Sequence, residues 1–167
     1  VEAARDIAEW TIMTTKFYSD PTTAPIPNSE TAIGAVAVIK HQSKYLLEKR
    51  SDSDRFGFIG GSLLPNESLE DCLNREIYEE TGIQIRGRPK LLFVLSNPGR
   101  VAHYQDGNIR RIVTNVFEVL LSTEPVLKIS EESSELHFLS RSELTKIPVA
   151  ETHAEIIERY FKLPAGG

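Results

Sequence analysis

The segment from Gly61 to Ile83 constrains the fold of this chain more than any other segment, because it contains residues that predict both ends of one short helix. Ser68 is a suitable N-cap, and Asp71, three residues later, supplies the acidic partner of a capping box. Gly82 suits the C-terminal end, where a residue in the left-handed conformation is often needed. Three apolar residues recur at four-residue spacing and should face the core: Leu69, Leu73 and Ile77. The sequence therefore predicts an amphipathic helix between Ser68 and Gly82.

The same helix carries a cluster of acidic residues. Because a helix turns by about 100° per residue, Glu76, Glu79 and Glu80 fall on one face. Like charges repel one another, so a bound cation would stabilise the cluster, and carboxylate oxygens suit hard ions such as Mg²⁺, Mn²⁺ or Ca²⁺. The alternative is a solvated acidic face, which is the usual meaning of an isolated Glu-x-x-Glu-Glu. The surrounding residues decide between the two.

Three neighbouring features favour the cation site. Gly60-Gly61 follows an apolar stretch, Phe56 to Ile59, and glycine lets backbone carbonyls come close to a metal ion. Arg75 lies one turn before Glu79 and can hold it in place with a forked contact. Glu67 lies outside the dense cluster, so it either supports the site through a water or a neighbouring residue, or binds the ion itself.

Taken together, these residues resemble the Nudix box. The defining positions of that motif are all present: Gly61, Glu67, Arg75, Glu76, Ile77, Glu79, Glu80, Gly82 and Ile83. The resemblance implies an α/β/α sandwich with a mixed central sheet. It also implies a Mg²⁺-dependent hydrolase, with Mn²⁺ as the alternative ion, that cleaves a nucleoside diphosphate linked to another group. One position departs from the family, since many relatives carry proline where this chain has Ile59; the change leaves the ligands intact and concerns the geometry of the loop.

The resemblance also assigns roles within the box. The implied metal ligands are the carbonyl of Gly61 and the carboxylates of Glu76, Glu79 and Glu80, and the implied catalytic set is Glu67, Arg75, Glu76, Glu79 and Glu80. The general base is a box glutamate in several relatives and lies on a distant loop in others, which makes Glu131 and Glu132 candidates. The alternative for these two residues is a solvated acidic loop.

The loop from Pro98 to Arg111 is the main candidate for substrate recognition. Pro98 lies 16 residues beyond Gly82, and a proline at that distance resembles the marker of ADP-ribose pyrophosphatases. The alternative is an ordinary Pro-Gly turn. Arginine can grip phosphate oxygens and an aromatic ring can stack on a nucleobase, so the candidate substrate-binding residues are Arg100, Tyr104, Arg110 and Arg111. The same arginines could instead balance surface charge, and His153 is predicted to be a surface or capping histidine.

Three functions are open on this basis. The first is a pyrophosphohydrolase for ADP-ribose or a similar nucleotide sugar. The second is a house-cleaning enzyme that acts on a nucleoside triphosphate, such as an oxidised one. The third is a ligand sensor without activity, because a fold alone does not determine function. The intact Arg75, Glu76, Glu79 and Glu80 weigh against the sensor, which has no need of every metal ligand.

Composition limits the number of domains, the kinds of partner and the cellular compartment. A chain of 167 residues with 40% hydrophobic residues is enough for one domain with a buried core. A net charge of −5 argues against duplex nucleic acid as a partner and fits cation binding better. The single cysteine, Cys72, excludes an intrachain disulfide, fits a cytoplasmic location and is predicted to fill the core. No apolar run approaches the roughly 20 residues that a membrane helix needs. The oligomeric state is not determined by the sequence, and a homodimer is one alternative.

The remaining pattern predicts strands that alternate with helices. Predicted strands cover residues 32–39, 44–50, 90–96, 112–121 and 135–139, and a polar loop covers 98–110. Predicted helices cover residues 3–17, 140–145 and 153–162. Such an alternation implies a sheet that is covered on both faces. Residues 32–167 would form the Nudix domain, and residues 1–31 a helix and a loop that pack on its core.

Overall fold

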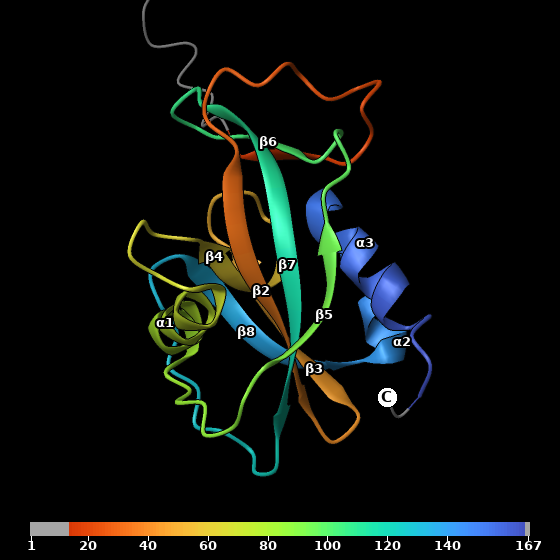
Figure 1. Cartoon of the computed structure of the whole chain (residues 1–167). Coiled ribbons are helices and arrows are strands. Elements are labelled where there is room, and N and C mark those ends of the chain that lie inside the picture. The colour runs from red at the N-terminus through yellow and green to blue at the C-terminus, as the bar shows by residue number, and fades with distance from the viewer. Residues whose placement is uncertain (1–13, 166–167) are drawn as a thin grey trace, which may run out of the picture.

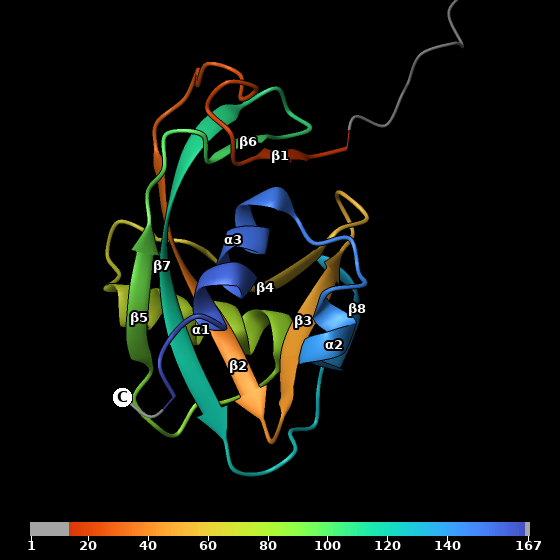
Figure 2. The same cartoon turned by 90° about the vertical axis from the view of Figure 1, so that its right-hand side faces the viewer.

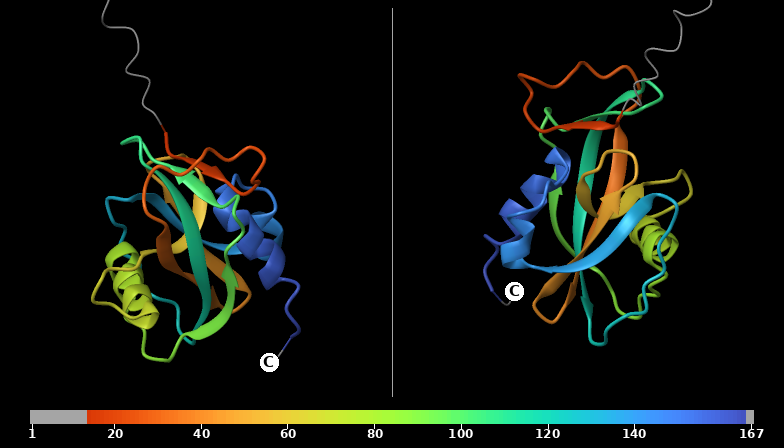
Figure 3. Two further views of the ribbon diagram at one scale, coloured as in Figure 1. Left: turned by 45° about the horizontal axis from the view of Figure 1, so that its top comes forward. Right: turned by 180° about the vertical axis from the view of Figure 1, so that it is seen from behind.

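The structure is a computed structural model that describes residues 14–165. Its strands are β1 (Lys16–Tyr18), β2 (Ala32–His41), β3 (Lys44–Arg50), β4 (Phe56–Ser62), β5 (Lys90–Leu95), β6 (Val101–His103), β7 (Ile109–Leu121) and β8 (Ser133–Ser140). Its helices are α1 (Leu69–Thr81), α2 (Arg141–Leu144) and α3 (Glu151–Tyr160). The strands form one mixed sheet, with α1 on one face and α3 on the other (Figure 1; Figure 3). This arrangement confirms the predicted α/β/α sandwich.

The sheet is built around β2. Across the sheet the strands follow the order β1, β6, β7, β2, β4, β3 and β8, and β5 pairs with β7. β2 runs parallel to β7, from Ala32 opposite Ile112 to His41 opposite Leu121. Its other neighbour, β4, is antiparallel, which makes the sheet mixed. Figure 2 shows β2 and β7 side by side, with β3 and β8 on the far side of β2.

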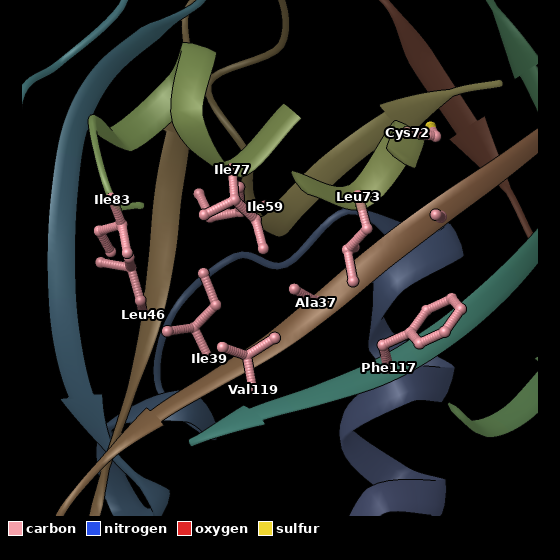
Figure 4. Packing of buried hydrophobic residues seen from close by; sticks show 11 residues of the cluster. Ala37, Ile39, Leu46, Ile59, Cys72, Leu73, Ile77, Ile83, Phe117 and Val119 are labelled. Atoms are coloured by element: carbon pink, nitrogen blue, oxygen red, sulfur yellow. The ribbon is translucent and has the colours of Figure 1, made fainter. Parts of the chain in front are cut away.

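Successive side chains of a strand point to opposite faces, so β2 contributes to two separate cores. The cluster on the α1 side includes Ala35, Ala37, Ile39, Leu73 and Ile77 (Figure 4). The cluster on the α3 side includes Val36, Val38, Leu144 and Ile156. Leu73 and Ile77 are fully buried and Leu69 packs against the first cluster, as predicted from their spacing. Cys72 is also fully buried, which confirms its place in the core.

The ends of α1 lie where the sequence predicts them. The N–H of Asp71 donates to Oγ of Ser68 at 3.1 Å, and the N–H of Ser68 donates to the carboxylate of Asp71 at 3.0 Å. Gly82 has a φ of 73° and donates its N–H to the carbonyl of Tyr78 at 2.9 Å. Most other residues are strained in that conformation. Both caps fix the length of the helix, and therefore the positions of its glutamates.

Besides β1, two strands lie where the sequence predicts none. β4 continues the apolar stretch from Phe56 through the glycine pair as far as Ser62, because its backbone pairs with β2 on one side and β3 on the other. β6 lies inside the predicted polar loop and pairs with β7, with Val101 opposite Arg111. In both cases the pairing partner, rather than the strand's own residues, determines the conformation.

The predicted helix over residues 3–17 is wrong at its C-terminal end. Residues 3–13 lie outside the described part of the chain, but Lys16 and Phe17 belong to β1, which pairs with β6. The ring of Phe17 lies 5.2 Å from the guanidinium of Arg50, a cation–π contact that attaches β1 to the core.

The loop between β1 and β2 also packs on the sheet. The N–H of Asn28 donates to the carbonyl of Ile109 at 3.0 Å. Gly99 lies directly behind the same loop, since a Cβ at this position would be 2.4 Å from the nitrogen of Pro21. Residues 14–31 therefore lie against the rest of the molecule, while the start of the Nudix domain at residue 32 stays a prediction. None of the helices within residues 14–165 is long and apolar enough to cross a membrane.

Candidate active site

The inward face of α1 carries two of the three box glutamates. Glu76 and Glu80 lie three and seven residues after Leu73, so they share the face that packs on the sheet. Glu80 is only 4% exposed and accepts a hydrogen bond from the N–H of Gly60 at 3.2 Å. Glu79 lies to the side, with 57% of its side chain exposed. The structure therefore brings Glu76 and Glu80 toward the glycine pair and places Glu79 at the rim.

A buried carboxylate from β3, absent from the sequence prediction, joins this pair. Glu48 is 2% exposed, accepts a hydrogen bond from the hydroxyl of Ser133, and acts on the pKa of Glu80 through its charge. The sequence did contain a signal for it. On a strand, Glu48 shares a face with Leu46, and Leu46 packs in the core on the α1 side. We refer to Glu48, Glu76 and Glu80 as the acidic cluster.

The surroundings of the acidic cluster disfavour ionised carboxylates. Burial, followed by the charges of Glu48 and Glu76, raises the pKa of Glu80 to about 9. Burial also raises the pKa of Glu48 and of Glu76. A nearby divalent ion would reverse these effects, because it stabilises the charged form. Among residues 14–165, no three Asp, Glu, His or Cys side chains already form a group that could hold a metal ion, so the ligand set stays a proposal.

Arg75 holds the glutamates around it. Its Nη1 donates to Glu76 at 2.8 Å and to Glu79 at 3.2 Å, which confirms the predicted pairing with Glu79. Its strongest contact is with Glu67, which accepts from both Nε and Nη2. This contact raises the pKa of Arg75 further above its usual range and lowers the pKa of Glu67. Glu67 also accepts from the N–H of Leu64 at 3.0 Å, so it links the arginine to the loop before α1.

Because Gly61 has no side chain, the carboxylate of Glu76 can lie against it. A Cβ at Gly61 would lie 2.3 Å from Oε1 of Glu76, closer than any real contact. A side chain at this position would therefore displace the carboxylate of Glu76, and the carbonyl of Gly61 lies 3.7 Å from Sγ of Cys72 on α1.

We expect Gly61→Ala to lower turnover by about 30- to 100-fold, because displacing a carboxylate that orients a site typically has that effect. The loss of stability should be small, since Gly61 does not have a positive φ. Gly87→Ala is the matched control, because no atom lies within 4 Å of a Cβ at Gly87. Kinetics and thermal unfolding of both variants check this; wild-type kinetics for Gly61→Ala would contradict the packing described.

A cavity of about 90 Å³ adjoins the glycine pair. Its walls include Gly60, Gly61, Arg50, Tyr104, Thr152 and His153. A larger cavity, of about 880 Å³, lies between the loop after α1 and the end of β7, and it contains none of the predicted site residues. The smaller cavity is therefore the one that adjoins predicted site residues, Gly61 and Tyr104, although none of the acidic cluster lines it.

The four candidate substrate residues occupy different environments. Tyr104 lines the small cavity, and Arg110 is near enough to act on its pKa. Arg100 is fully buried, where it donates to Thr114 at 2.9 Å and lies 3.3 Å from Glu155, so it cannot meet a ligand directly. Arg111 donates to the carbonyl of Ser96 at 2.8 Å. Of the four, only Tyr104 lines the cavity beside the glycine pair, and Arg110 lies near Tyr104.

The two candidate bases on the distant loop also differ. Both lie on an exposed segment whose backbone carbonyls accept from the hydroxyl of Ser51. The charge of Glu132 raises the pKa of Glu48, Glu76 and Glu80. No such effect of Glu131 is seen among the leading influences on these three groups. The loop therefore brings Glu132 nearer to the acidic cluster than Glu131.

His153 is neither a surface residue nor a cap. It lies in the first turn of α3, and the N-cap of this helix, Ala150, makes no side-chain hydrogen bond. Its Nδ1 instead accepts from the N–H of Phe58 at 2.9 Å. Burial, together with the charges of Arg50 and Arg100, lowers its pKa to about 3. Sequence spacing does not reveal this contact, because it joins residues that are far apart in the chain.

The lowered pKa of His153 predicts a loss of stability in mild acid. The unfolded chain takes up a proton near pH 6.5 and the folded chain does not, so stability falls as the pH drops below 6.5. Relative to His153→Asn, which does not titrate, the wild-type protein should lose about 1–2 kcal/mol between pH 7 and pH 5. Urea unfolding at both pH values measures this difference; a constant difference between the two proteins would contradict it.

Fold and site together form an α/β/α sandwich with an acidic helix set against a glycine pair. A family model for the NUDIX domain matches residues 29–160, and the chain belongs to this family. It is a Nudix hydrolase, an enzyme that acts on pyrophosphate bonds. Nudix hydrolases generally use divalent metal ions.

Two curated relatives match most of the chain. It is 30% identical to the ADP-ribose pyrophosphatase of Methanocaldococcus jannaschii over 138 residues, which is 81% of this chain and 76% of that protein. It is 28% identical to the nucleoside triphosphatase NudI of an Enterobacter species over 122 residues, 68% of this chain and 85% of that protein. Among solved structures, the NUDIX domain of Shewanella oneidensis NrtR complexed with ADP ribose has a TM-score of 0.65 at 22% identity, covering 86% of this chain and 92% of that one.

Proposed function

We propose that the protein is a Mg²⁺-dependent pyrophosphohydrolase that cleaves a nucleoside diphosphate linked to another group, with ADP-ribose or a similar nucleotide sugar as the substrate. The observation that carries this proposal is the acidic cluster, in which Glu80 of α1 is buried beside the glycine pair and Glu48 is buried on β3. The similarity to an ADP-ribose pyrophosphatase over 81% of the chain supports the substrate.

The residues present fit a divalent ion. Glu76 and Glu80 have raised pKa values, first because burial disfavours their charged forms and then because other carboxylates lie nearby. Gly61 keeps its side of the site free of a side chain. The proposed ligands are the carbonyl of Gly61 and the carboxylates of Glu76, Glu79 and Glu80; Glu48 adds charge behind them. Such an ion, when bound, would neutralise phosphate charge and lower the pKa of a water molecule.

The chain itself contributes positioning and charge. Arg75 holds Glu76 and Glu79 in place and is in turn anchored by Glu67. Because hydrolysis of a phosphoanhydride needs accurate placement more than a covalent nucleophile, this rigid support is the main task of the side chains around the cluster. Water adds across one P–O–P linkage, so each turnover yields two phosphorylated products and releases protons.

A general base completes the proposal. We assign this role to Glu132, because its charge acts on every member of the acidic cluster. Glu131 is the alternative on the same loop, and a box glutamate is the alternative on α1. We also propose that the enzyme acts in the cytoplasm, where the buried thiol of Cys72 stays reduced. A homodimer is a further proposal about its assembly.

Hydrolysis of a nucleoside triphosphate is the second candidate, and the 28% identity to the triphosphatase NudI favours it. A screen of nucleotide sugars, triphosphates and dinucleotides in Mg²⁺ separates the two, with product analysis by chromatography. We expect the highest kcat/KM for ADP-ribose. Turnover of triphosphates alone would contradict the proposed substrate, and nucleotide binding without any turnover would point to a ligand sensor.

A further inference from the structure

The cavity beside the glycine pair has free hydrogen-bonding groups on its walls. Within residues 14–165, neither the hydroxyl of Tyr104 nor that of Thr152 has a hydrogen-bond partner, although both residues line the cavity. Burial raises the pKa of Tyr104, so its phenol keeps its proton. A ligand that enters the cavity therefore meets neutral hydroxyl groups.

The imidazole of His153 adds a donor of fixed direction. Its Nδ1 accepts from the N–H of Phe58 at 2.9 Å, and the ring lies 6.3 Å from that of Phe58 at an interplanar angle of 29°. The ring is uncharged, because its pKa is lowered to about 3. A neutral imidazole that accepts at Nδ1 carries its proton on Nε2. Among the described residues no acceptor bonds this Nε2–H, and the residue lines the cavity.

The one arginine among the described residues that line the cavity is already paired. Arg50 makes a forked contact with Asp52, at 2.8 and 2.9 Å, and lies 3.7 Å from Glu48. Arg100, behind the wall, is paired with Glu155 at 3.3 Å. A phosphate group in the cavity would therefore meet no unpaired cation among the described lining residues, so the site favours an uncharged, oxygen-rich group.

The size of the cavity also favours a small, oxygen-rich group. At about 90 Å³ it is smaller than the cavity of roughly 150 Å³ that encloses a benzene ring. A nucleobase therefore does not fit inside, whereas the hydroxyl edge of a sugar does.

We propose that His153 and Tyr104 bind the hydroxyl edge of the sugar attached to the nucleoside diphosphate, with Nε2–H of His153 as the donor that positions it. This inference rests on the proposed function and specifies which part of the substrate the small cavity takes. It makes His153 a specificity-determining residue, since a substrate without that sugar gains nothing from the contact.

Two substitutions separate this role from a structural one. In His153→Asn the shorter amide reaches the Nδ1 position, so its oxygen can still accept from Phe58, but no donor reaches the cavity. In His153→Gln the amide nitrogen reaches the Nε2 position, while Phe58 loses its acceptor. His137→Asn is the matched control, because His137 is exposed and bonds only Glu135 at 2.6 Å.

We expect His153→Asn to raise KM for ADP-ribose about tenfold, the effect of one lost hydrogen bond, with kcat changed less than twofold. Its inhibition by ADP, which lacks the second sugar, should match that of the wild type. His153→Gln should keep KM within about threefold of the wild type but unfold at a lower temperature. A purely structural role would instead make KM follow the unfolding temperature in both variants.

Several outcomes would overturn the inference. One is an unchanged KM for His153→Asn; another is inhibition by ADP that weakens as much as binding of ADP-ribose, which would place the donor on the nucleotide. If the wild type hydrolyses no nucleotide sugar, the proposed function is wrong, but the role of His153 in sugar binding can still be tested. Calorimetric binding of ADP-ribose then provides that test. An equal Kd for wild type and His153→Asn, or no binding at all, would then contradict it, and a tenfold weaker Kd would support it.

Discussion

Glu80→Gln should lower Mg²⁺-dependent turnover by about 1000-fold or more, since the charge stabilisation provided by a correctly bound ion amounts to several kcal/mol. Glu80 is the most enclosed carboxylate of the box, and its N–H partner, Gly60, fixes it beside Gly61. Glutamine keeps the shape of the side chain and removes its charge. Glu79→Gln should also abolish turnover if Glu79 turns from the rim toward the ion.

The fold of Glu80→Gln should survive, and the metal-free protein should become more stable. The folded pKa of about 9 lies above the unfolded value of 4.5, so ionising Glu80 costs stability that is lost progressively as the pH rises through this range. At pH 7 without metal the gain should be about 2–3 kcal/mol. Urea unfolding in EDTA measures it, and a less stable variant would contradict the assigned electrostatics.

Glu70→Gln is the matched control for this substitution. Glu70 lies on the same helix, but its only contact in the described structure is a 3.4 Å ion pair with Arg88. We expect its kinetics to stay within about twofold of the wild type, because exposed pairs contribute little. Near-normal activity of Glu80→Gln would show that this carboxylate is not part of the catalytic machinery.

Arg75→Lys should reduce kcat/KM by about 30- to 100-fold, as is typical when a residue that orients metal ligands is lost. The forked guanidinium contacts Glu67, Glu76 and Glu79 at once, and the ammonium of lysine cannot reproduce this geometry. Because the charge is retained, stability should change by less than about 1 kcal/mol. Steady-state kinetics and thermal unfolding measure the two effects independently.

Arg88→Lys tests whether any arginine-to-lysine change has this effect. Arg88 is 84% exposed and pairs only with Glu70 in the described residues. It should leave kcat/KM within about twofold. An equal loss in both variants, or no loss in Arg75→Lys, would show that the network around Arg75 is not needed to hold the glutamates.

The helix of the site could be predicted from sequence because its determinants are local. The capping box at Ser68, the apolar spacing and the left-handed Gly82 all act within a few residues of one another. The acidic cluster could be predicted only in part. Glu48 comes from a strand 28 residues before Glu76, so its contribution depends on the pairing of β3 with β4, which sequence spacing alone does not show.

The substrate side of the site depended on long-range contacts and was harder to predict. Arg100 looked like a phosphate-binding residue, yet its carbonyl and side chain are engaged within the fold, next to β7 and α3. His153 on α3 accepts from the backbone of Phe58 in β4, a contact between residues 95 positions apart. Side chains of this kind acquire their roles only when β4, β7 and α3 come together. The type of reaction is therefore easier to predict from the sequence than the identity of the substrate.

Phosphorus NMR of the wild-type protein with ADP-ribose, in Mg²⁺ and then in EDTA, tests the proposed activity. With Mg²⁺ the two resonances of the diphosphate should be replaced by two phosphomonoester resonances, and with EDTA they should persist. No conversion with either Mg²⁺ or Mn²⁺, or equal conversion in EDTA, would contradict a metal-dependent pyrophosphohydrolase built on the acidic cluster of α1 and β3.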